Sequence, residues 1–238
     1  MAFDHGLALG ADGLEFDVHL SRDGVVVVHH DATLERTTNG RGRISDFSAD
    51  DLAQIDAAHW FTPIGSRTEY PFRGQGHGIP RLQTVLARYA GIPIIIELKD
   101  SDPRLVERTI DALREANAID RAALGSFYWR ALNHAREDEP RLRTGSSREE
   151  TRWALYRSRL RWPVKRAAFH EFQVPEAVGG TTVVTPRFIA HAHRAGLPVK
   201  VWTVDDRHDI TRLIEWGVDG LISDRPDIAV DVVRRMTA

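Results

Sequence analysis

The sequence predicts an α/β protein of the (β/α)8 TIM-barrel type. Short apolar runs alternate with amphipathic helical patterns almost to the end of the chain, which favours parallel strands joined by right-handed helical crossovers. Side chains suited to chemistry lie at the ends of apolar runs, as at Glu97, Lys99 and Trp202, and barrel enzymes place their active sites at this edge. The chain has no dinucleotide fingerprint and no P-loop, which argues against an open doubly wound sheet.

In the first half of the chain, a helical pattern at residues 3–9 precedes two strand-like runs at 14–19 and 25–29. Arg22-Asp23-Gly24 predicts a turn between these runs. Ser48 and Asp51 have the spacing of a capping box, so a short helix is expected to begin there. Residues 57–79 are rich in glycine and have no regular periodicity, and a helix is expected at 82–89, after Pro80. We therefore expect a single domain, residues 1–238, with a loop-rich insertion at about 31–80.

The second half repeats strand and helix units. Residues 92–99 form a nearly continuous apolar run, as expected of a parallel strand that is buried on both faces. Gly196 and Gly217 follow helical patterns that they are expected to terminate. The further strands are expected at 122–127, 142–144, 167–174, 198–204 and 220–223, and the helices at 103–116, 129–137, 147–160, 186–195, 207–216 and 226–236.

Composition narrows the class of protein. A formal net charge of −2 over 238 residues gives no electrostatic reason to expect nucleic acid as the main partner. The absence of cysteine excludes disulfides and thiolate metal sites. No apolar run approaches the roughly 18–20 residues of a membrane span, so no integral membrane segment is expected. We expect a cytoplasmic protein; the sequence leaves its oligomeric state open.

Two carboxylates on one strand give the first indication of a site. Glu15 and Asp17 are two residues apart, and strand side chains alternate between faces, so both point the same way. Neither carboxylate is stable inside a barrel unless a cation lies close to it, and a divalent metal is the simplest such cation. His30 ends the second apolar run, where a side chain that transfers protons could act.

These residues and several other segments of the chain resemble the glycerophosphodiester phosphodiesterases, a family of metal-dependent barrel enzymes. The resemblance extends in order over essentially the whole chain. The matching segments are Gly10-Ala11-Asp12-Gly13-Leu14-Glu15-Phe16-Asp17, Asp23-Gly24, His30-Asp31, Leu34-Glu35-Arg36-Thr37-Thr38-Asn39-Gly40, Ile79-Pro80-Arg81-Leu82, Ile96-Glu97-Leu98-Lys99, Gln173-Val174-Pro175, Val201-Trp202-Thr203-Val204 and residues 217–226.

The resemblance implies a metal site. Glu15, Asp17 and Glu97 correspond to carboxylate ligands of a divalent cation, Ca²⁺ or Mg²⁺. This implication agrees with the chemistry, because hard cations bind oxygen ligands and can neutralise and orient a phosphate group. The residue types would also suit a structural ion pair between Glu97 and Lys99.

The resemblance also assigns roles to three other side chains. His30 corresponds to one of two catalytic histidines, and whether it donates or accepts the proton stays open. Lys99 is two residues beyond Glu97, on the same face, where its ammonium group could hold the phosphate. Trp202 corresponds to the aromatic residue that lines the glycerol side of the pocket; the alternative is that this tryptophan simply packs in the core.

One departure from the family pattern concerns the start of the chain. The family has a first strand that ends in His-Arg-Gly and a nearby Pro-Glu-Asn-Thr motif, and neither motif occurs here before the helical pattern at residues 3–9. We therefore expect an incomplete barrel whose first strand is absent from this chain. An in-frame upstream segment on the order of 20–30 residues is expected to encode it, since a closed barrel needs every strand paired.

The expected function is metal-dependent hydrolysis of small glycerophosphodiesters to sn-glycerol 3-phosphate and an alcohol whose identity stays open. One alternative is a truncated, non-catalytic barrel that binds metal or phosphodiester without turnover. Another is a metal-independent glycosidase, which a chelator would not inhibit. A basic aromatic stretch also suggests a weak membrane-surface contact, although a solvated helix face is the simpler interpretation. That stretch comprises Trp153, Tyr156, Arg157, Arg159, Arg161 and Trp162.

Overall fold

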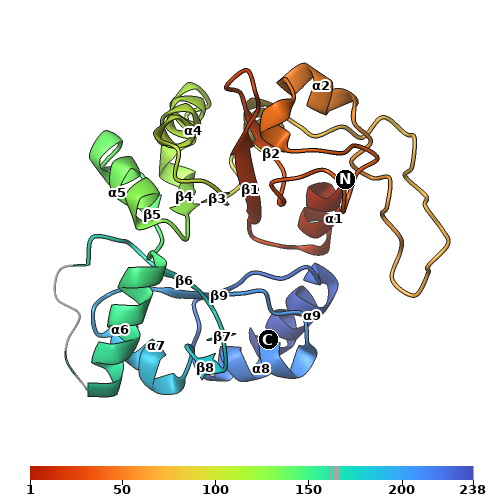
Figure 1. Ribbon diagram of the computed structural model, residues 1–238. Helices are drawn as coiled ribbons and strands as arrows, with labels where there is room; N and C mark the ends of the chain where they lie inside the picture. The colour runs from red at the N-terminus through yellow and green to blue at the C-terminus, as the bar shows by residue number, and fades with distance from the viewer. Residues whose placement is uncertain (161, 163–166, 238) are drawn as a thin grey trace.

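The computed structural model describes residues 1–160, 162 and 167–237 and has the alternating α/β order that the sequence predicts (Figure 1). The strands are β1 (Leu14–Leu20), β2 (Val26–Val28), β3 (Ile94–Leu98), β4 (Ala122–Gly125), β5 (Arg143–Thr144), β6 (Phe172–Pro175), β7 (Ala177–Val178), β8 (Thr181–Thr182), β9 (Val199–Trp202) and β10 (Gly220–Leu221). The α-helices are α1 (Ala2–Leu9), α2 (Ala49–Gln54), α3 (Leu82–Arg88), α4 (Pro103–Glu115), α5 (Trp129–Asp138), α6 (Arg148–Leu160), α7 (Pro186–His193), α8 (Arg207–Glu215) and α9 (Pro226–Thr237).

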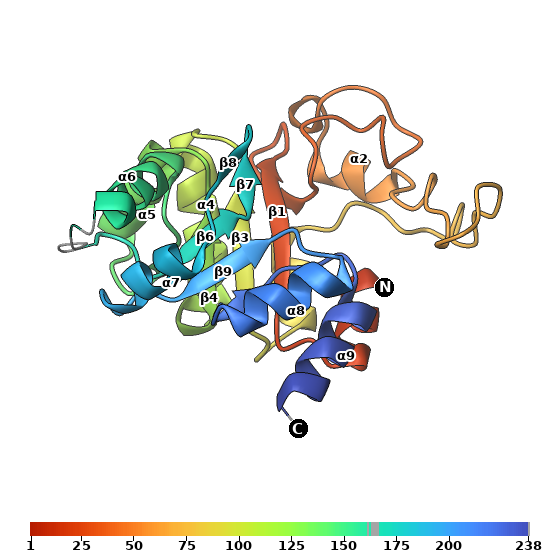
Figure 2. The ribbon, with the colours of Figure 1, turned by 90° about the horizontal axis from the view of Figure 1, so that it is seen from below.

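Parallel strands form an open barrel. One sheet has the order β2-β1-β3-β4-β5, in which only β2 is antiparallel, and a second sheet has the order β10-β9-β6. A parallel bridge between Gly145 and Glu171 continues the first sheet into the second. Helices cover the outside of both sheets (Figures 1 and 2). The barrel-type α/β fold is therefore confirmed, but among the described residues no strand pairs with both β10 and β1, so the ring is open there.

On the outside of this opening, the two ends of the chain lie together. Helices α1 and α9 are side by side in both views (Figures 1 and 2), and Arg234 Nη2 donates a hydrogen bond to the carbonyl of Leu9 at 3.1 Å. Gly10 ends α1 with φ of 108°, a left-handed conformation that favours glycine. A Cβ atom at this position would also collide with the Arg234 guanidinium. This contact joins α1, which precedes β1, to α9, which follows β10.

Strand alternation separates an apolar exterior layer from a polar interior. On β1, Phe16 and Val18 are buried with the helices, whereas Glu15 and Asp17 point to the other side of the strand. A second cluster fills the space around β6 and β9, and a third, around Leu34, Ile44 and Leu52, supports residues 31–80. The segment that was expected to be an insertion thus has a small core of its own.

Charged side chains also hold the seam between the two sheets. Glu171 is fully buried, and its carboxylate lies 2.7 Å from Lys200 Nζ and 3.1 Å from Arg143 Nη2. Gln173 Nε2 donates a further hydrogen bond to Glu171 at 2.8 Å. A buried carboxylate without partners is very costly. Glu171 therefore requires Arg143 and Lys200 to stay close to it, and these contacts keep β5, β6 and β9 packed together.

The expected elements match the observed ones closely, with two exceptions. The strand expected at 167–174 begins only at Phe172, because the chain before it is irregular. The hairpin of β7 and β8 was not expected; Gly179 and Gly180, both with positive φ, form its turn. Within the described part of the chain, no helix combines the length and the apolarity that crossing a bilayer requires.

Packing of α4 on the sheet predicts a stability difference. Ile110 is completely buried on α4, so Ile110→Ala should lower the free energy of unfolding by about 2–5 kcal/mol. Ile64→Ala is the matched control: this side chain is 81% exposed, and the change should stay within about 0.5 kcal/mol. Urea unfolding followed by circular dichroism measures both values. Equal values for the two variants would contradict the packing described here.

Candidate metal and phosphodiester site

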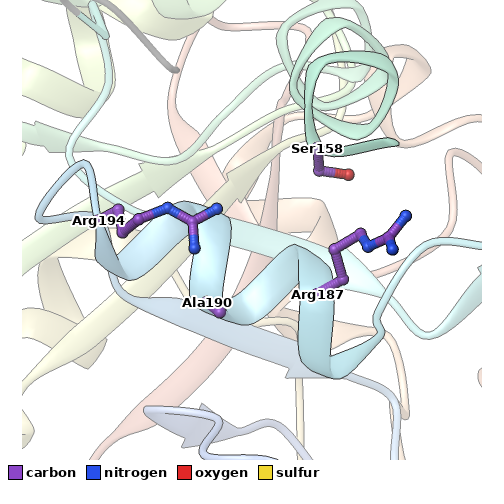
Figure 3. Close-up of a pocket in the computed structure, with 4 residues that line it drawn as sticks. All are labelled: Ser158, Arg187, Ala190 and Arg194. Carbon is purple, nitrogen blue, oxygen red and sulfur yellow. The ribbon is translucent and has the colours of Figure 1, made fainter. Parts of the chain in front are cut away.

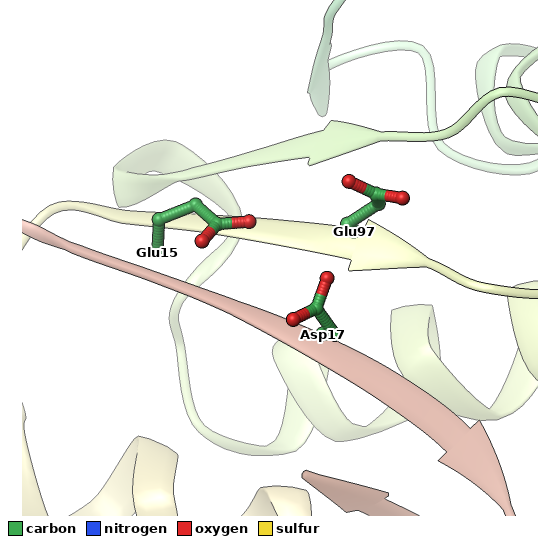
Figure 4. A group of neighbouring side chains, drawn as sticks. All are labelled: Glu15, Asp17 and Glu97. Carbon is green, nitrogen blue, oxygen red and sulfur yellow. The ribbon is translucent and has the colours of Figure 1, made fainter. Parts of the chain in front are cut away.

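Three carboxylates meet inside the barrel. In the parallel register of β1 and β3, Asp17 lies opposite Glu97, and Glu15 lies one layer deeper, opposite Ile95. Figure 4 shows the Glu15 side chain extending along the strand toward the other two carboxylates. One carboxylate oxygen from each of the three residues lies within 4.8 Å of the others. The structure therefore brings together the three residues that were expected to bind a metal.

Lys99 occupies the same interior face. Its Nζ atom lies 2.8 Å from Asp17 Oδ1 and 3.0 Å from Glu97 Oε1. Burial would lower the pKa of Lys99, but the two carboxylates raise it above its ordinary value. Lys99 thus contacts two of the expected metal ligands directly, as the structural ion-pair interpretation required.

The remaining negative charge is poorly compensated. Burial, together with the nearby charges of Asp17 and Glu97, raises the pKa of Glu15 to about 8. Burial also raises the pKa of Glu97, although Lys99 acts in the opposite direction. Glu97 Oε1 is buried, and the Lys99 ammonium group lies 3.0 Å from it. Three converging carboxylates with one ammonium group beside them fit a hard divalent cation, which prefers oxygen ligands.

His30 lies at the mouth, beyond the end of β2. Its side chain is 63% exposed, and its Nδ1 atom lies 2.6 Å from Asp31 Oδ1. Arg36 holds Asp31 through two hydrogen bonds, of 2.6 and 2.9 Å, and this contact lowers the pKa of Asp31. A positive charge on His30 would act on the pKa of Glu97 in the same direction as Lys99, against the larger effect of burial. The contact with Asp31 orients Nδ1 of His30, which leaves Nε2 for a reacting group.

Two neighbouring histidines are engaged differently. His19 is buried, its Nε2 lies 3.2 Å from the carbonyl oxygen of His30, and burial lowers its pKa. His29 Nε2 lies 3.3 Å from the carbonyl oxygen of Thr33, and burial lowers its pKa as well. Both rings contact the backbone of the loop that carries His30, so they are placed to support that loop.

Trp202 lies at the end of β9 and forms an edge-on contact with Phe127, with 5.8 Å between ring centroids. The Arg148 guanidinium lies 5.1 Å from the centroid of Phe127. Phe127 also borders a cavity of about 770 Å³. The cavity is lined by Ser101, Phe127, Tyr128, Trp129, Arg130, Arg148, Glu149, Glu150 and Trp153.

This combination of an acidic cluster, a lysine and an oriented histidine at the mouth of a parallel barrel agrees with comparisons to known proteins. A profile of the "Glycerophosphoryl diester phosphodiesterase family" matches residues 1–228. The chain belongs to this family. It is therefore a phosphoric diester hydrolase of the glycerophosphodiester phosphodiesterase type, a class whose members generally depend on a metal ion.

Individual glycerophosphodiester phosphodiesterases support the assignment. The chain is 29% identical to a glycerophosphodiester phosphodiesterase of Caldanaerobacter subterraneus over 245 residues, which cover 98% of this chain and 90% of that protein. A crystal structure of the enzyme from Agrobacterium tumefaciens is 26% identical, with a TM-score of 0.77 and coverage of 97% and 90%. An Oleispira antarctica phosphodiesterase in complex with sn-glycerol-3-phosphate has the same fold, with 24% identity, a TM-score of 0.77 and coverage of 98% and 90%.

Sequence reasoning assigned no role to Asp31, Arg36 or Phe127. Asp31 follows His30 directly, and a carboxylate next to a candidate acid or base was a signal that could have been used. The Arg36 contact depends on the path of a loop, and the contact of Phe127 with Trp202 joins the loop after β4 to the end of β9, which is distant in the sequence. Neither contact follows from periodicity.

The raised pKa of Glu15 predicts proton release on metal binding. Below about pH 8 this carboxyl is protonated in the metal-free protein, whereas a metal needs the carboxylate. Binding of Ca²⁺ or Mg²⁺ should therefore release a proton near neutral pH, and the apparent affinity should rise with pH until about 8. Calorimetry in two buffers of different ionisation enthalpy measures the proton count. Release that is unchanged in Glu15→Gln would contradict the assignment.

Proposed function

We propose that this chain hydrolyses glycerophosphodiesters to sn-glycerol 3-phosphate and an alcohol, with a Ca²⁺ or Mg²⁺ ion held by Glu15, Asp17 and Glu97. The observation that carries the proposal is the convergence of three largely buried carboxylates that have Lys99 as their one close cationic partner in the described residues. Three acidic groups at this spacing are costly without a further cation. Family membership favours phosphodiester hydrolysis over the glycosidase alternative.

When bound, the cation would neutralise and orient the phosphate group. Lys99 would then share its ammonium group with a phosphate oxygen, since it lies between Asp17 and Glu97 on the face that the carboxylates share. A protonated amine at this position stabilises the negative charge that accumulates on the phosphate during attack. Lys99 is in this proposal a substrate-binding residue, as the family resemblance implies.

His30 would transfer the proton. Asp31 holds its Nδ1 side, and Arg36 fixes Asp31, so the free Nε2 atom is positioned at the mouth toward the attacking or leaving oxygen. The attacking oxygen is either water or the substrate's own glycerol hydroxyl. Trp202 would pack against the glycerol carbon atoms, and its contact with Phe127 fixes the position of the ring.

One observation favours a second candidate, a barrel that binds metal and phosphodiester without turnover. In the described residues no strand joins β10 to β1, so the barrel that surrounds the site is open there. Binding and hydrolysis must therefore be measured separately.

The proposal predicts hydrolysis that depends on the metal. The chain should release sn-glycerol 3-phosphate from glycerophosphocholine or a similar diester, and EDTA should abolish the release until Ca²⁺ or Mg²⁺ is restored. Glu15→Gln should weaken metal binding and remove most activity without unfolding the protein. The matched control is Glu69→Gln, an exposed carboxylate in the long loop, which should change neither.

A coupled assay for sn-glycerol 3-phosphate and calorimetric metal titration separate the outcomes. Metal binding with no product would favour the binding-only candidate. Product formation that resists exhaustive chelation would contradict the metal-dependent mechanism.

The role of His30 predicts an asymmetry between adjacent histidines. General acid or base groups typically contribute about 10²–10⁴-fold to rate, so His30→Ala should lower kcat by this factor. His29→Ala should have a smaller effect, because the ring of His29 contacts the carbonyl oxygen of Thr33. Steady-state kinetics of both variants, with circular dichroism as a check on folding, measure the difference. Equal losses would show that the two rings serve the loop rather than proton transfer.

A further inference from the structure

The outward side of α6 carries a stripe of large apolar side chains. Trp153, Tyr156 and Leu160 are 61%, 53% and 44% exposed. At about 100° per residue, they fall within an arc of about 60° on the helix surface. Trp153 and Tyr156 contact each other edge-on, with 6.2 Å between ring centroids. Trp162, just beyond the helix, is also exposed. A solvated barrel helix does not require this much exposed aromatic surface.

Arginines flank the stripe. On α6, Arg152 and Arg159 lie on one side of it and Arg157 on the other, at the same helical spacing. None of the three lies within salt-bridge distance of a carboxylate in the parts of the chain that the structure describes. Arg161, which belongs to the same basic stretch of sequence, lies outside the described residues.

The neighbouring helix α7 adds two further guanidinium groups. Arg187 and Arg194 border a cavity of about 330 Å³ between α6 and α7, together with Ser158 and Ala190 (Figure 3). Neither arginine has a carboxylate partner among the described residues. His191, also on α7, is buried, and its pKa is lowered by burial and by the positive charges of Arg194 and Arg157.

We propose that this surface, the α6–α7 face, docks the protein on the surface of an anionic lipid bilayer. The face consists of Arg152, Trp153, Tyr156, Arg157, Arg159, Leu160, Arg187 and Arg194. Trp and Tyr side chains favour the headgroup region of a bilayer, where their rings are in an apolar layer and their polar atoms reach water. Unpaired arginines attract anionic headgroups, and the cavity between the two helices has room for a phosphate group.

Charge decides between the possible occupants. The chain as a whole has a formal net charge of −2, yet this face presents five guanidinium groups without carboxylate partners in the described residues around an apolar stripe, while Glu149 in the first turn of α6 is an exposed carboxylate on the same side of the helix. A second copy of the chain docked symmetrically here would bring like charges together. A soluble anion alone would leave the exposed aromatic side chains without a partner. A negatively charged bilayer would attract the arginines and would also take up the exposed aromatic side chains.

The α6–α7 face adjoins the aromatic cavity that Phe127 borders. Trp153 belongs to the α6–α7 face and also lines the cavity of about 770 Å³ that Phe127 borders. Phe127 in turn contacts Trp202 at the end of β9. A docked molecule would therefore hold this aromatic cavity, and the barrel mouth beside it, close to the lipid surface.

Co-sedimentation of the full chain with vesicles tests the proposal. The chain should bind vesicles of mixed phosphatidylcholine and phosphatidylglycerol, bind pure phosphatidylcholine vesicles weakly, and dissociate as salt is raised. Two double variants, Trp153→Ala with Tyr156→Ala and Arg187→Glu with Arg194→Glu, should each lower the partition coefficient by at least about tenfold. The matched controls are Trp60→Ala with Phe61→Ala, two aromatic residues that are each 50% exposed in the long loop, and Arg41→Glu with Arg67→Glu. These controls should bind like the unaltered protein.

Circular dichroism of every variant confirms that binding is compared between folded proteins. Absence of binding to the anionic vesicles would overturn the proposal. It would be overturned equally by binding that the α6–α7 variants retain, or by binding that the loop controls lose. Full displacement by millimolar inorganic phosphate at constant ionic strength would identify a soluble-anion site instead of a bilayer surface.

Discussion

The structure depends most on how the negative charge inside the barrel is compensated. Alternation along β1 and β3 directs Glu15, Asp17 and Glu97 inward while their neighbours pack against helices, so the same strands build the core and the site. The ammonium group of Lys99 compensates part of that charge, and protonation of Glu15 compensates more, because burial raises its pKa to about 8. A divalent cation would replace both forms of compensation. This is why the acidic cluster is better explained as a binding site than as a structural ion pair alone.

The open edge of the barrel bears on the same charges. In the described residues β10 pairs only with β9, and the hydrogen bond from Arg234 to Leu9 joins the helix after β10 to the helix before β1. Glu15 lies in the part of β1 that precedes the residues paired with β2, so on that side of the strand this part is unpaired in the described residues. The charge of Asp224, beyond β10, acts on Glu15 from the other side.

Much of the site could be predicted from the sequence because it follows from local rules. The inward direction of Glu15, Asp17 and Glu97 needs only strand alternation and parallel register, and the capping box at Ser48 is confirmed at the start of α2. Contacts that depend on how distant strands approach could not be predicted. The buried Glu171 lies just before β6, and its partners Arg143 and Lys200 come from β5 and β9, whereas the cavity between α6 and α7 comes from the packing of two helices. The expectation that Lys99 binds phosphate is untested, since the structure shows it on the carboxylates.

The most direct test of the metal site is anomalous diffraction from crystals grown with Mn²⁺, a hard divalent ion that oxygen ligands accept. The account predicts a strong anomalous peak among the carboxylates of Glu15, Asp17 and Glu97, at about 2.0–2.6 Å from one oxygen of each. Lys99 should then have moved away from at least one of its two carboxylate partners. A peak elsewhere, or a cluster that binds no manganese while Asp17 and Glu97 keep their contacts with Lys99, would contradict it.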